Sequence, residues 1–441
     1  MLTWLGFGMV TAFMTLIMTR RLSPLVALIT VPVLFALLGG FGAAQLGEMM
    51  LAGLRMLAPT GVMLMFAIFY FGLMIDVGLF DPLIRVILRV VGGDPTKVVV
   101  GTALLAAFVS LDGDGSTTYM ITVAAMLPLY RRLRLDPLNL TCVTILASGV
   151  MNLTPWGGPL ARAASALHVE PAAVFVPMLP AMAAGIAGVL GLAWLLGRRE
   201  KQRLGHLSLS AATTQSASMT DSALIPPQAN ADAVRRPKLL AINALLTLLL
   251  LAALVLGVLP LPVLFMVAFA VALLINYPKV SDQRERIAAH AKNVIAVVSL
   301  IFAAGIFTGI LNGTGMLDAM SKSMLDVIPS ALGPYLAPIT ALASLPFTFF
   351  VSNDAFYFGV VPIVAETASE FGISAVEIAR ASLIGQPVHL LSPLVPSTYL
   401  LVGLAGVEFG DHQRFTLKWA ALICLLMLLA SLLCAVFPLA T

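Results

Sequence analysis

SLDGDGSTTY, residues 110–119, puts two aspartates inside an apolar part of the chain. Its flanks, 97–110 and 117–129, are apolar, but each rises only about 20 Å as a helix. A membrane crossing needs about 30 Å, so neither flank crosses alone. Lys97 and Arg131 put the same charge at the two open ends. We therefore predict a re-entrant hairpin whose tip, with its flexible Gly113 and Gly115, lies near the middle of a bilayer.

A second polar interruption, FVSNDAFYF at residues 350–358, has the same form. It offers Ser352, Asn353 and Asp354 between two short apolar arms. The acidic residues Glu366 and Glu370 follow this second interruption, whereas arginines follow the first one. This contrast predicts a second hairpin that enters from the opposite side.

The composition of the whole chain supports a membrane protein. Of 441 residues, 60% are hydrophobic and 10% are charged, where a soluble domain has about 25% charged residues. Soluble, disordered and disulfide-framework proteins are excluded by these values. Cys142, Cys424 and Cys434 lie in apolar runs without metal-ligand spacing, so we interpret them as small hydrophobic residues.

Eight apolar runs are long enough to cross a bilayer. They are 2–19, 22–40, 59–78, 172–197, 239–257, 260–277, 293–311 and 414–437. Two further segments, 137–167 and 375–405, are equally long but are broken by Pro and polar residues. With both termini outside, most of the 25 Lys and Arg residues fall inside, and only Arg55 and Lys322 fall outside. The positive-inside rule favours this topology.

The chain repeats itself with a shift of about 238 positions, according to five matched features. Run 2–19 falls on 240–257, Pro24 on Pro262, GLFD (78–81) near GMLD (315–318), Thr154-Pro155 on Ser392-Pro393, and ALHVE (166–170) on LAGVE (404–408). Each half then holds five crossings and one hairpin, and the odd number inverts the second half. We predict an all-α polytopic membrane protein with an inverted-topology repeat: 1–200, a flexible cytoplasmic linker at 201–237, and 238–441.

Two proline-broken helices complete the expected site at the bilayer midplane. GVMNLTPWGGPLAR (149–162) and GQPVHLLSPLVPST (385–398) lose amide donors at their prolines, which frees carbonyls and exposes helix N-termini. The alternative is a proline kink with a packing role only. The groups expected to bind a substrate are Ser116, Thr117, Asn152, Thr154, Gly157, Gly158, Ser352, Asn353, Ser392, Ser397 and Thr398.

Four titratable groups are candidates for proton or cation coupling: Asp112, Asp114, Asp354 and His389. Asp114 and Asp354 have an alternative role as helix caps, which does not explain Asp112. His389 either carries a proton or donates one structural hydrogen bond. Arg162 either pairs with a substrate carboxylate or extends to the outer interface.

The four motifs SLDGDGSTTYMITVAAMLPLY, GVMNLTPWGGPLARA, FVSNDAFYFGVVPI and GQPVHLLSPLVPSTYL closely resemble the bacterial citrate–metal ion:proton symporters (CitMHS type) of the ion-transporter superfamily. The resemblance covers nearly the whole chain. It implies uptake of citrate complexed with Mg²⁺ or Ca²⁺, driven by protons, through an elevator-type homodimer in the bacterial inner membrane. It implies no enzyme activity, no permanent cofactor and no nucleic-acid partner.

The charge of the cargo agrees with this resemblance. Citrate is mainly a trianion at neutral pH, and a divalent metal reduces the complex to one negative charge. Asp112 and Asp114 would either contact the metal of the complex, which prefers oxygen ligands, or carry the protons.

Three rival functions remain at the level of sequence. A di- or tricarboxylate or oxyanion carrier of the same architecture would not require metal. An intramembrane aspartyl protease is disfavoured because Asp112 and Asp114 share one turn and no Gly-x-Gly-Asp is present. A channel fits poorly with an inverted repeat that carries two hairpins.

Overall fold

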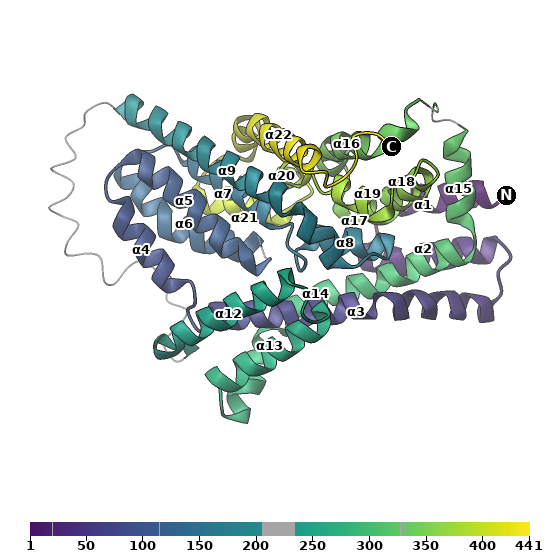
Figure 1. Ribbon diagram of the computed structural model, residues 1–441, viewed down its shortest axis with the longest axis horizontal. Coiled ribbons are helices and arrows are strands. Elements are labelled where there is room, and N and C mark those ends of the chain that lie inside the picture. The colour runs from purple at the N-terminus through teal and green to yellow at the C-terminus, as the bar shows by residue number, and fades with distance from the viewer. Residues whose placement is uncertain (20, 114, 205–233, 327–328, 330) are drawn as a thin grey trace.

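The computed structural model describes residues 1–19, 21–113, 115–204, 234–326, 329 and 331–441. The described residues form helices and connecting turns, without β-strands. In Figure 1, α2, α3, α12, α13 and α14 lie along the lower side, and the hairpins and broken helices lie above them. Both termini lie in the right-hand half of the view, while α9 ends on the left.

The described residues of the first half form nine α-helices and a short 3₁₀ turn. They are α1 (Leu2–Met18), α2 (Pro24–Leu38), α3 (Ala43–Asp76), α4 (Asp81–Val91), α5 (Pro95–Val109), η1 (Ser110–Asp112), α6 (Gly115–Arg132), α7 (Pro137–Met151), α8 (Gly158–Leu167) and α9 (Pro171–Leu204). Asp94 and Asp136 cap α5 and α7, and a proline follows each cap. These two Asp-Pro pairs begin the hairpin and the first broken helix at the same side of the molecule.

The second half repeats this order of elements. It contains η2 (Pro237–Leu239), α12 (Leu240–Val255), α13 (Leu261–Asn276), α14 (Val280–Gly313), α15 (Met316–Leu325), η3 (Gly333–Tyr335), α16 (Leu336–Phe350), α17 (Asn353–Ala355), the π-helical turn η4 (Phe356–Val360), α18 (Val361–Ser369), α19 (Ala375–Ser382), α20 (Gln386–His389), α21 (Pro396–Ala405) and α22 (Phe409–Leu433). The starts of α6, α7, α8 and α9 recur 238 positions later at α17, α19, α21 and α22.

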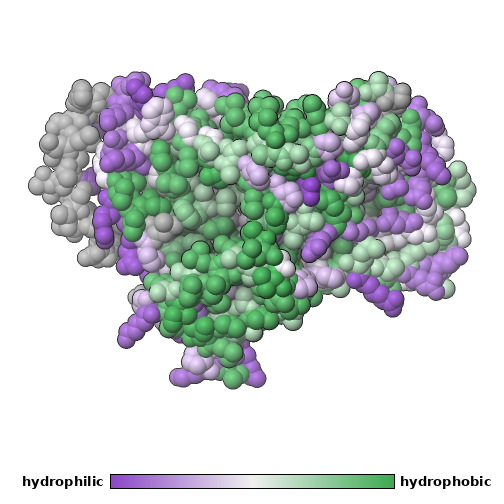
Figure 2. All heavy atoms as spheres, in the orientation of Figure 1, coloured by the Kyte–Doolittle hydropathy of each residue, from purple (hydrophilic) through white to green (hydrophobic). Residues whose placement is uncertain are grey.

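Within the part of the chain that the structure describes, six helices are long and apolar enough to cross a membrane. They are α3, α5 with η1, α9, η2 with α12, α14 and α22, and shorter apolar helices fill the remaining predicted runs. Hydrophobic residues cover the middle of the face in Figure 2, and hydrophilic residues gather toward the two ends of the long axis. This distribution indicates that the helices cross the membrane along the long axis of the view.

The long helices α3 and α14 cross in contact through glycines. A Cβ atom on Gly53 would lie 3.0 Å from Gly309, and one on Gly72 would lie 2.6 Å from the His290 ring. With a shift of 237 positions, Gly53 corresponds to His290 and Gly72 corresponds to Gly309. The Gly53–Gly309 contact and the Gly72–His290 contact are therefore equivalent when the two repeats are exchanged. A two-fold axis that exchanges two antiparallel crossing helices runs perpendicular to them, in the plane of the membrane. The repeat is therefore inverted, as predicted.

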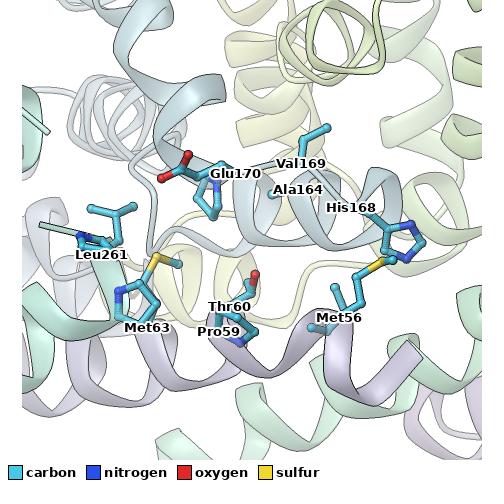
Figure 3. Close-up of a pocket in the computed structure, with 13 residues that line it drawn as sticks. Met56, Pro59, Thr60, Met63, Ala164, His168, Val169, Glu170 and Leu261 are labelled. Carbon is cyan, nitrogen blue, oxygen red and sulfur yellow. The ribbon is translucent and has the colours of Figure 1, made fainter. Parts of the chain in front are cut away.

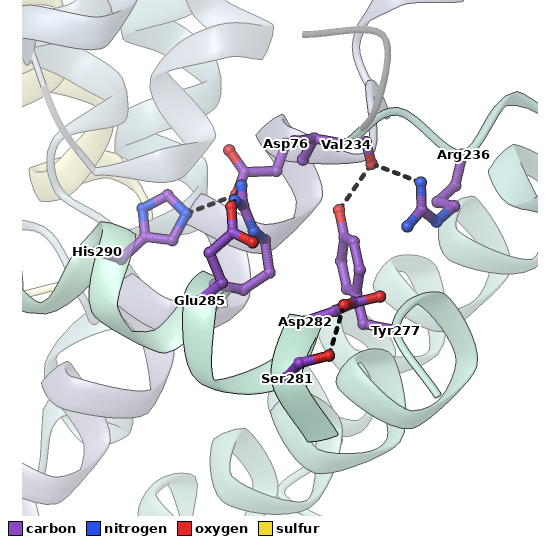
Figure 4. A network of polar contacts seen from close by, with 9 residues as sticks. Asp76, Val234, Arg236, Tyr277, Ser281, Asp282, Glu285 and His290 are labelled. Atoms are coloured by element: carbon purple, nitrogen blue, oxygen red, sulfur yellow. Dashed lines mark hydrogen bonds and ion pairs between the residues drawn. The ribbon is translucent and has the colours of Figure 1, made fainter. Parts of the chain in front are cut away.

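A polar cluster joins the end of α3 to the start of α14 (Figure 4). Asp76 accepts from His290 Nε2 at 2.9 Å and from Arg286 Nη1 at 3.2 Å. Beside it, Tyr277 donates its hydroxyl to the Val234 carbonyl at 2.7 Å. This bond fastens the end of the predicted linker to the end of α13.

The first hairpin is paired along its length. Thr102 Oγ1 donates to the Tyr130 hydroxyl at 3.3 Å near the open end, and Ser110 and Thr118 lie 3.2 Å apart near the tip. The end of α9 holds the open end: Lys201 pairs with Asp94 at 3.0 Å. The α5–α6 hairpin therefore opens on the side where α9 ends.

The second hairpin, α16 to α18, opens at the other end of α9. Arg380, in the segment that follows this hairpin, donates to the carbonyls of Val436 and of Ala173 at the start of α9. The hydroxyl of Thr441 donates to the Phe371 carbonyl at 2.6 Å. Because 34 helical residues of α9 separate its two ends by about 50 Å, the hairpins enter from opposite sides.

Several helices extend beyond the apolar runs that predicted them. Helices α3 and α14 begin at Ala43 and Val280, well before the predicted runs at 59 and 293. Helix α9 continues to Leu204, beyond the predicted start of the linker, and residues 205–233 lie outside the described part. Arg235, at the predicted end of the linker, is paired with Asp81 at 3.3 Å.

Candidate functional site

The tip of the first hairpin is a tight turn. Helix α5 ends at Val109, η1 carries Asp112, and Gly113 has a φ of +78°, which favours glycine. Asp112 is buried, with 8% of its surface exposed. Ser116 and Thr117 lie in the first turn of α6. The predicted role of Asp114 falls outside the described residues and stays a prediction.

Trp156 fixes this tip against the first broken helix. Its Nε1 donates to the Leu111 carbonyl at 2.8 Å, and a Cβ on Gly113 would lie 2.9 Å from its ring. The indole stacks on Phe71 of α3 at 4.7 Å and meets Phe265 of α13 edge-on at 5.3 Å. Trp156 was not among the predicted site residues, although it lies inside the segment GVMNLTPWGGPLAR (149–162).

The first broken helix has the predicted form. Helix α7 ends at Met151 and α8 begins at Gly158. A Cβ on Gly157 would lie 2.0 Å from the Asn152 carbonyl, so only glycine fits there. Thr154 is 2% exposed, and its Oγ1 has no hydrogen-bond partner. A buried hydroxyl without a hydrogen-bond partner is unusual in a folded protein, and the predicted role of Thr154 in substrate binding would explain it.

The tip of the second hairpin begins a short α-helix, and the turn after it is wider than a regular α-helical turn. Ser352 caps α17 by accepting from the Ala355 amide at 3.2 Å. The π-helical turn η4 follows directly. Such turns occur frequently at functional sites because the wider turn moves side chains out of the regular register.

An ion pair joins this tip to the first broken helix. Arg162 Nε lies 2.5 Å from Asp354 Oδ1, and Arg162 Nη1 donates to the Gly158 carbonyl at 3.0 Å. The side chains of Arg162 and Asp354 are 23% and 13% exposed. The carboxylate at Arg162 here is a protein side chain, so pairing of Arg162 with a substrate carboxylate stays a prediction.

Gln386 joins the same tip to the second broken helix. It is fully buried, and its Nε2 donates to the Tyr357 hydroxyl at 2.8 Å and to Asn353 Oδ1 at 3.2 Å. Asn353 Nδ2 donates back to Gln386 Oε1 at 3.3 Å. Gln386 was not among the predicted site residues, although its place beside Pro387 in the broken segment is a signal that could have indicated it.

The second broken helix uses several predicted groups for its own backbone. Ser392 accepts from the Leu394 amide at 3.2 Å, and the Thr398 hydroxyl donates to the Leu390 carbonyl. His389 is buried, and its Nδ1 lies 2.6 Å from the Thr348 carbonyl. This contact is the structural hydrogen bond expected as one role of His389. Ser397 is half-buried in the first turn of α21.

The two broken helices touch at equivalent positions. A Cβ on Gly149 would lie 2.9 Å from the Cα of Pro387, and the two residues differ by 238 in number. A residue that contacts its own counterpart lies near the pseudo-two-fold axis. The contacts at Trp156, Arg162 and Gln386 therefore gather both tips and both breaks around this axis.

A pocket of about 300 Å³ lies beside the first broken helix (Figure 3). Met56, Pro59, Thr60 and Met63 of α3 form one wall. The opposite wall comes from Ala164 of α8 and from the α8–α9 connection, with His168, Val169 and Glu170, and Leu261 closes one end. The pocket separates α3 from the segment that carries Arg162.

Comparison with known proteins gives consistent matches. The family model described as Citrate transporter (CitMHS) matches residues 13–385. A Bacillus subtilis citrate transporter is 59% identical over 98% of this chain and 99% of its own length. A Mg²⁺/citrate complex secondary transporter of Bacillus subtilis is 53% identical over 98% of both chains.

Two solved structures share the fold at low sequence identity. The YdaH transporter of Alcanivorax borkumensis, described as having an unusual topology, gives a TM-score of 0.54 at 14% identity and covers 89% of both chains. MtrF of Neisseria gonorrhoeae, one of a class of antimetabolite efflux pumps, gives a TM-score of 0.60 at 15% identity, over 88% of this chain and 83% of its own.

Proposed function

Because the chain belongs to the CitMHS family of citrate transporters, we propose that it takes up citrate complexed with a divalent metal ion in symport with protons. The chain is a transporter and not an enzyme. A relative named as a Mg²⁺/citrate complex secondary transporter supports a metal complex as the cargo. Our choice of Mg²⁺ or Ca²⁺ rests on the family resemblance. We place the protein in the bacterial inner membrane, with both termini outside and residues 201–237 in the cytoplasm.

The metal enters as part of the cargo. The described residues contain no group of three or more His, Cys, Asp or Glu side chains that could hold a metal ion. We propose that citrate supplies most of the ligands of the metal, and that Asp112 and Asp114 take part only as contacts to the metal of the complex. One negative charge remains on the complex, which lowers the free energy needed to carry it through a low-dielectric path.

One observation carries the proposed site: the first broken helix contacts both hairpin tips, through Trp156 and through the Arg162–Asp354 pair. The N-termini of α6 and α8 would attract the carboxylates, and the Thr154 hydroxyl is available to bind them. The remaining predicted substrate groups lie on these tips and breaks. Asp112, Asp114, Asp354 and His389 are the candidates for proton coupling.

We propose an elevator-type motion between two parts. The α3–α14 crossing would be the fixed part, because backbone contacts between glycines leave no room for sliding. The hairpins and broken helices would move against it, with the pocket of Figure 3 at the boundary. The family resemblance supports a homodimer built on the fixed part.

The decisive experiment is initial-rate uptake of labelled citrate into proteoliposomes, across a panel of divalent cations and with or without a pH gradient. We expect uptake that requires Mg²⁺ or Ca²⁺, stops with EDTA and accelerates when the outside is acid. Uptake of citrate or succinate without metal would instead establish a metal-independent carboxylate carrier. Conductance at channel rates would contradict a carrier altogether.

A further inference from the structure

The Arg162–Asp354 pair provides a direct route from cargo binding to proton binding. Arg162 is held by the Gly158 carbonyl within the first turns of α8, while Asp354 belongs to the tip of the other hairpin. The two side chains therefore meet across the two repeats, 192 positions apart. Cargo that binds at Arg162 would compete with Asp354 for the same guanidinium.

We propose that a carboxylate of the metal–citrate complex replaces Asp354 at Arg162, and that the displaced Asp354 takes up the coupling proton. This inference rests on the proposed function and assigns one proton to one residue. The step is balanced: the Asp354 carboxylate binds H⁺ from the water to which the site is open, and it releases the same H⁺ when the complex leaves and the ion pair forms again.

The surroundings of Asp354 make a lone negative charge unfavourable. Its side chain is 13% exposed, so water does little to stabilise an unpaired carboxylate. Helices α1 and α8 and the turn η4 pack on α17, and Arg162 is the only charged side chain among these elements. The other titratable groups nearby are Tyr357, which is bound to Gln386, and His389, which is bound to Thr348. None of them replaces the lost guanidinium as a positive partner.

Among Arg162, Asp354 and the cargo, the charges balance in both states only if Asp354 is protonated in the loaded state. In the empty carrier, Arg162 and Asp354 cancel. In the loaded carrier, Arg162 cancels the single negative charge of the complex, and a neutral Asp354 leaves the sum at zero. An ionised Asp354 would leave one buried negative charge, which opposes movement through the membrane.

Thermodynamic linkage makes this exchange measurable without transport. If binding adds one proton to Asp354, then the affinity for the complex rises as the pH falls, by up to about tenfold per pH unit. Citrate also changes its own protonation over this range, but it does so equally for every variant. The difference between wild type and Asp354→Asn therefore isolates the contribution of Asp354.

The test is calorimetric titration of purified protein with Mg²⁺-citrate between pH 6 and 8, in two buffers of different ionisation enthalpy. We expect wild type to take up about one more proton per bound complex than Asp354→Asn, and the affinity of the variant to vary less with pH. Counterflow of labelled citrate should survive in Asp354→Asn, because the amide imitates the protonated acid, whereas uptake driven by a pH gradient should be lost.

Glu370→Gln, an exposed acid of the same hairpin, is the matched control and should behave as wild type. Arg162→Lys should keep the linked proton while binding more weakly, which provides a second variant if Asp354→Asn does not fold. Equal proton uptake by wild type and Asp354→Asn would overturn the exchange. Failure of wild type itself to bind Mg²⁺-citrate would instead overturn the proposed function.

Discussion

The hydrogen bond from Trp156 Nε1 to the Leu111 carbonyl sets the position of the first hairpin tip, and with it the position of Asp112. Trp156→Phe keeps the ring contact with Phe71 but removes this bond, which is worth about 1 kcal/mol. We expect the folded protein to persist and the initial rate of citrate uptake to fall by about tenfold, because a displaced tip misplaces the carboxylate.

The measurement compares uptake rates of Trp156→Phe and Trp194→Phe at equal amounts of inserted protein. Trp194 lies on α9 with 49% of its surface exposed, so its replacement should leave the rate unchanged. Wild-type kinetics in Trp156→Phe would show that the bond does not position the tip.

Single residues of the site were predictable where polar side chains interrupt an apolar run. Asp112, Asp354 and Arg162 stand out in this way. Their partners do not follow from the sequence, because the Arg162–Asp354 pair spans 192 positions and depends on how the repeats pack. Trp156 and Gln386 were missed because one aromatic or amide side chain beside prolines carries no periodic signal.

At the scale of elements, the first hairpin depends on how its open end is fastened. Asp94 caps α5 by accepting from the Thr96 amide at 2.8 Å and also pairs with Lys201 of α9 at 3.0 Å. Asp94→Ala removes both contacts, and we expect the free energy of unfolding at pH 7 to fall by about 1 kcal/mol. Lys201→Ala removes only the exposed ion pair and should have a smaller effect, since such pairs contribute about 0–1 kcal/mol.

The effect of Asp94 should depend on pH in one direction. Burial alone would raise the pKa of Asp94, but the bonds from Lys201 and Thr96 outweigh it and lower the pKa below the usual 3.8. A carboxyl with a lowered pKa stabilises the fold above its unfolded-state pKa, and this stabilisation is lost as the pH falls through the lower value in the folded state. Thermal unfolding of wild type and Asp94→Ala should therefore differ at neutral pH and converge below pH 3.8. A constant difference across this range would contradict an ionic role.

The predicted elements were correct where hydrophobicity alone defines them. The apolar runs located the crossing helices, and the prolines located both breaks. The amphipathic helices α4 and α15 were not assigned, because each buries only one side: Ile84, Ile87 and Val91 are buried while Arg85 and Arg89 are exposed. The early starts of α3 and α14 were missed for a similar reason, since their first turns contain polar residues that an apolar run excludes.

At the scale of the whole molecule, the pseudo-two-fold symmetry follows from sequence only in part. The recurring shift predicts two copies, and the odd number of crossings predicts their inversion. The place where the copies meet depends on small residues that allow two helices to approach closely, such as Gly53 and Gly309 in the α3–α14 crossing. Because glycines are frequent along the chain, sequence alone does not show which of them form the contact.

If the broken helices move against a fixed α3–α14 crossing, a cross-link between the two parts should stop transport, whereas a cross-link within the fixed part should not. In a background where exposed Cys434 is replaced by Ser, Met56→Cys and Val169→Cys place thiols on opposite walls of the pocket in Figure 3. A short bifunctional maleimide across this pocket should stop both net uptake and counterflow, because either process requires the broken helix to move past α3.

Leu46→Cys with Ile310→Cys provides the matched control, because these buried residues pack together within the α3–α14 crossing. Linking them joins two helices that an elevator keeps fixed, so transport should continue at the rate of the unlinked protein. Loss of transport in both linked variants would mean that α3 and α14 slide during the cycle, and the elevator would have to be replaced by a rocking of one repeat against the other.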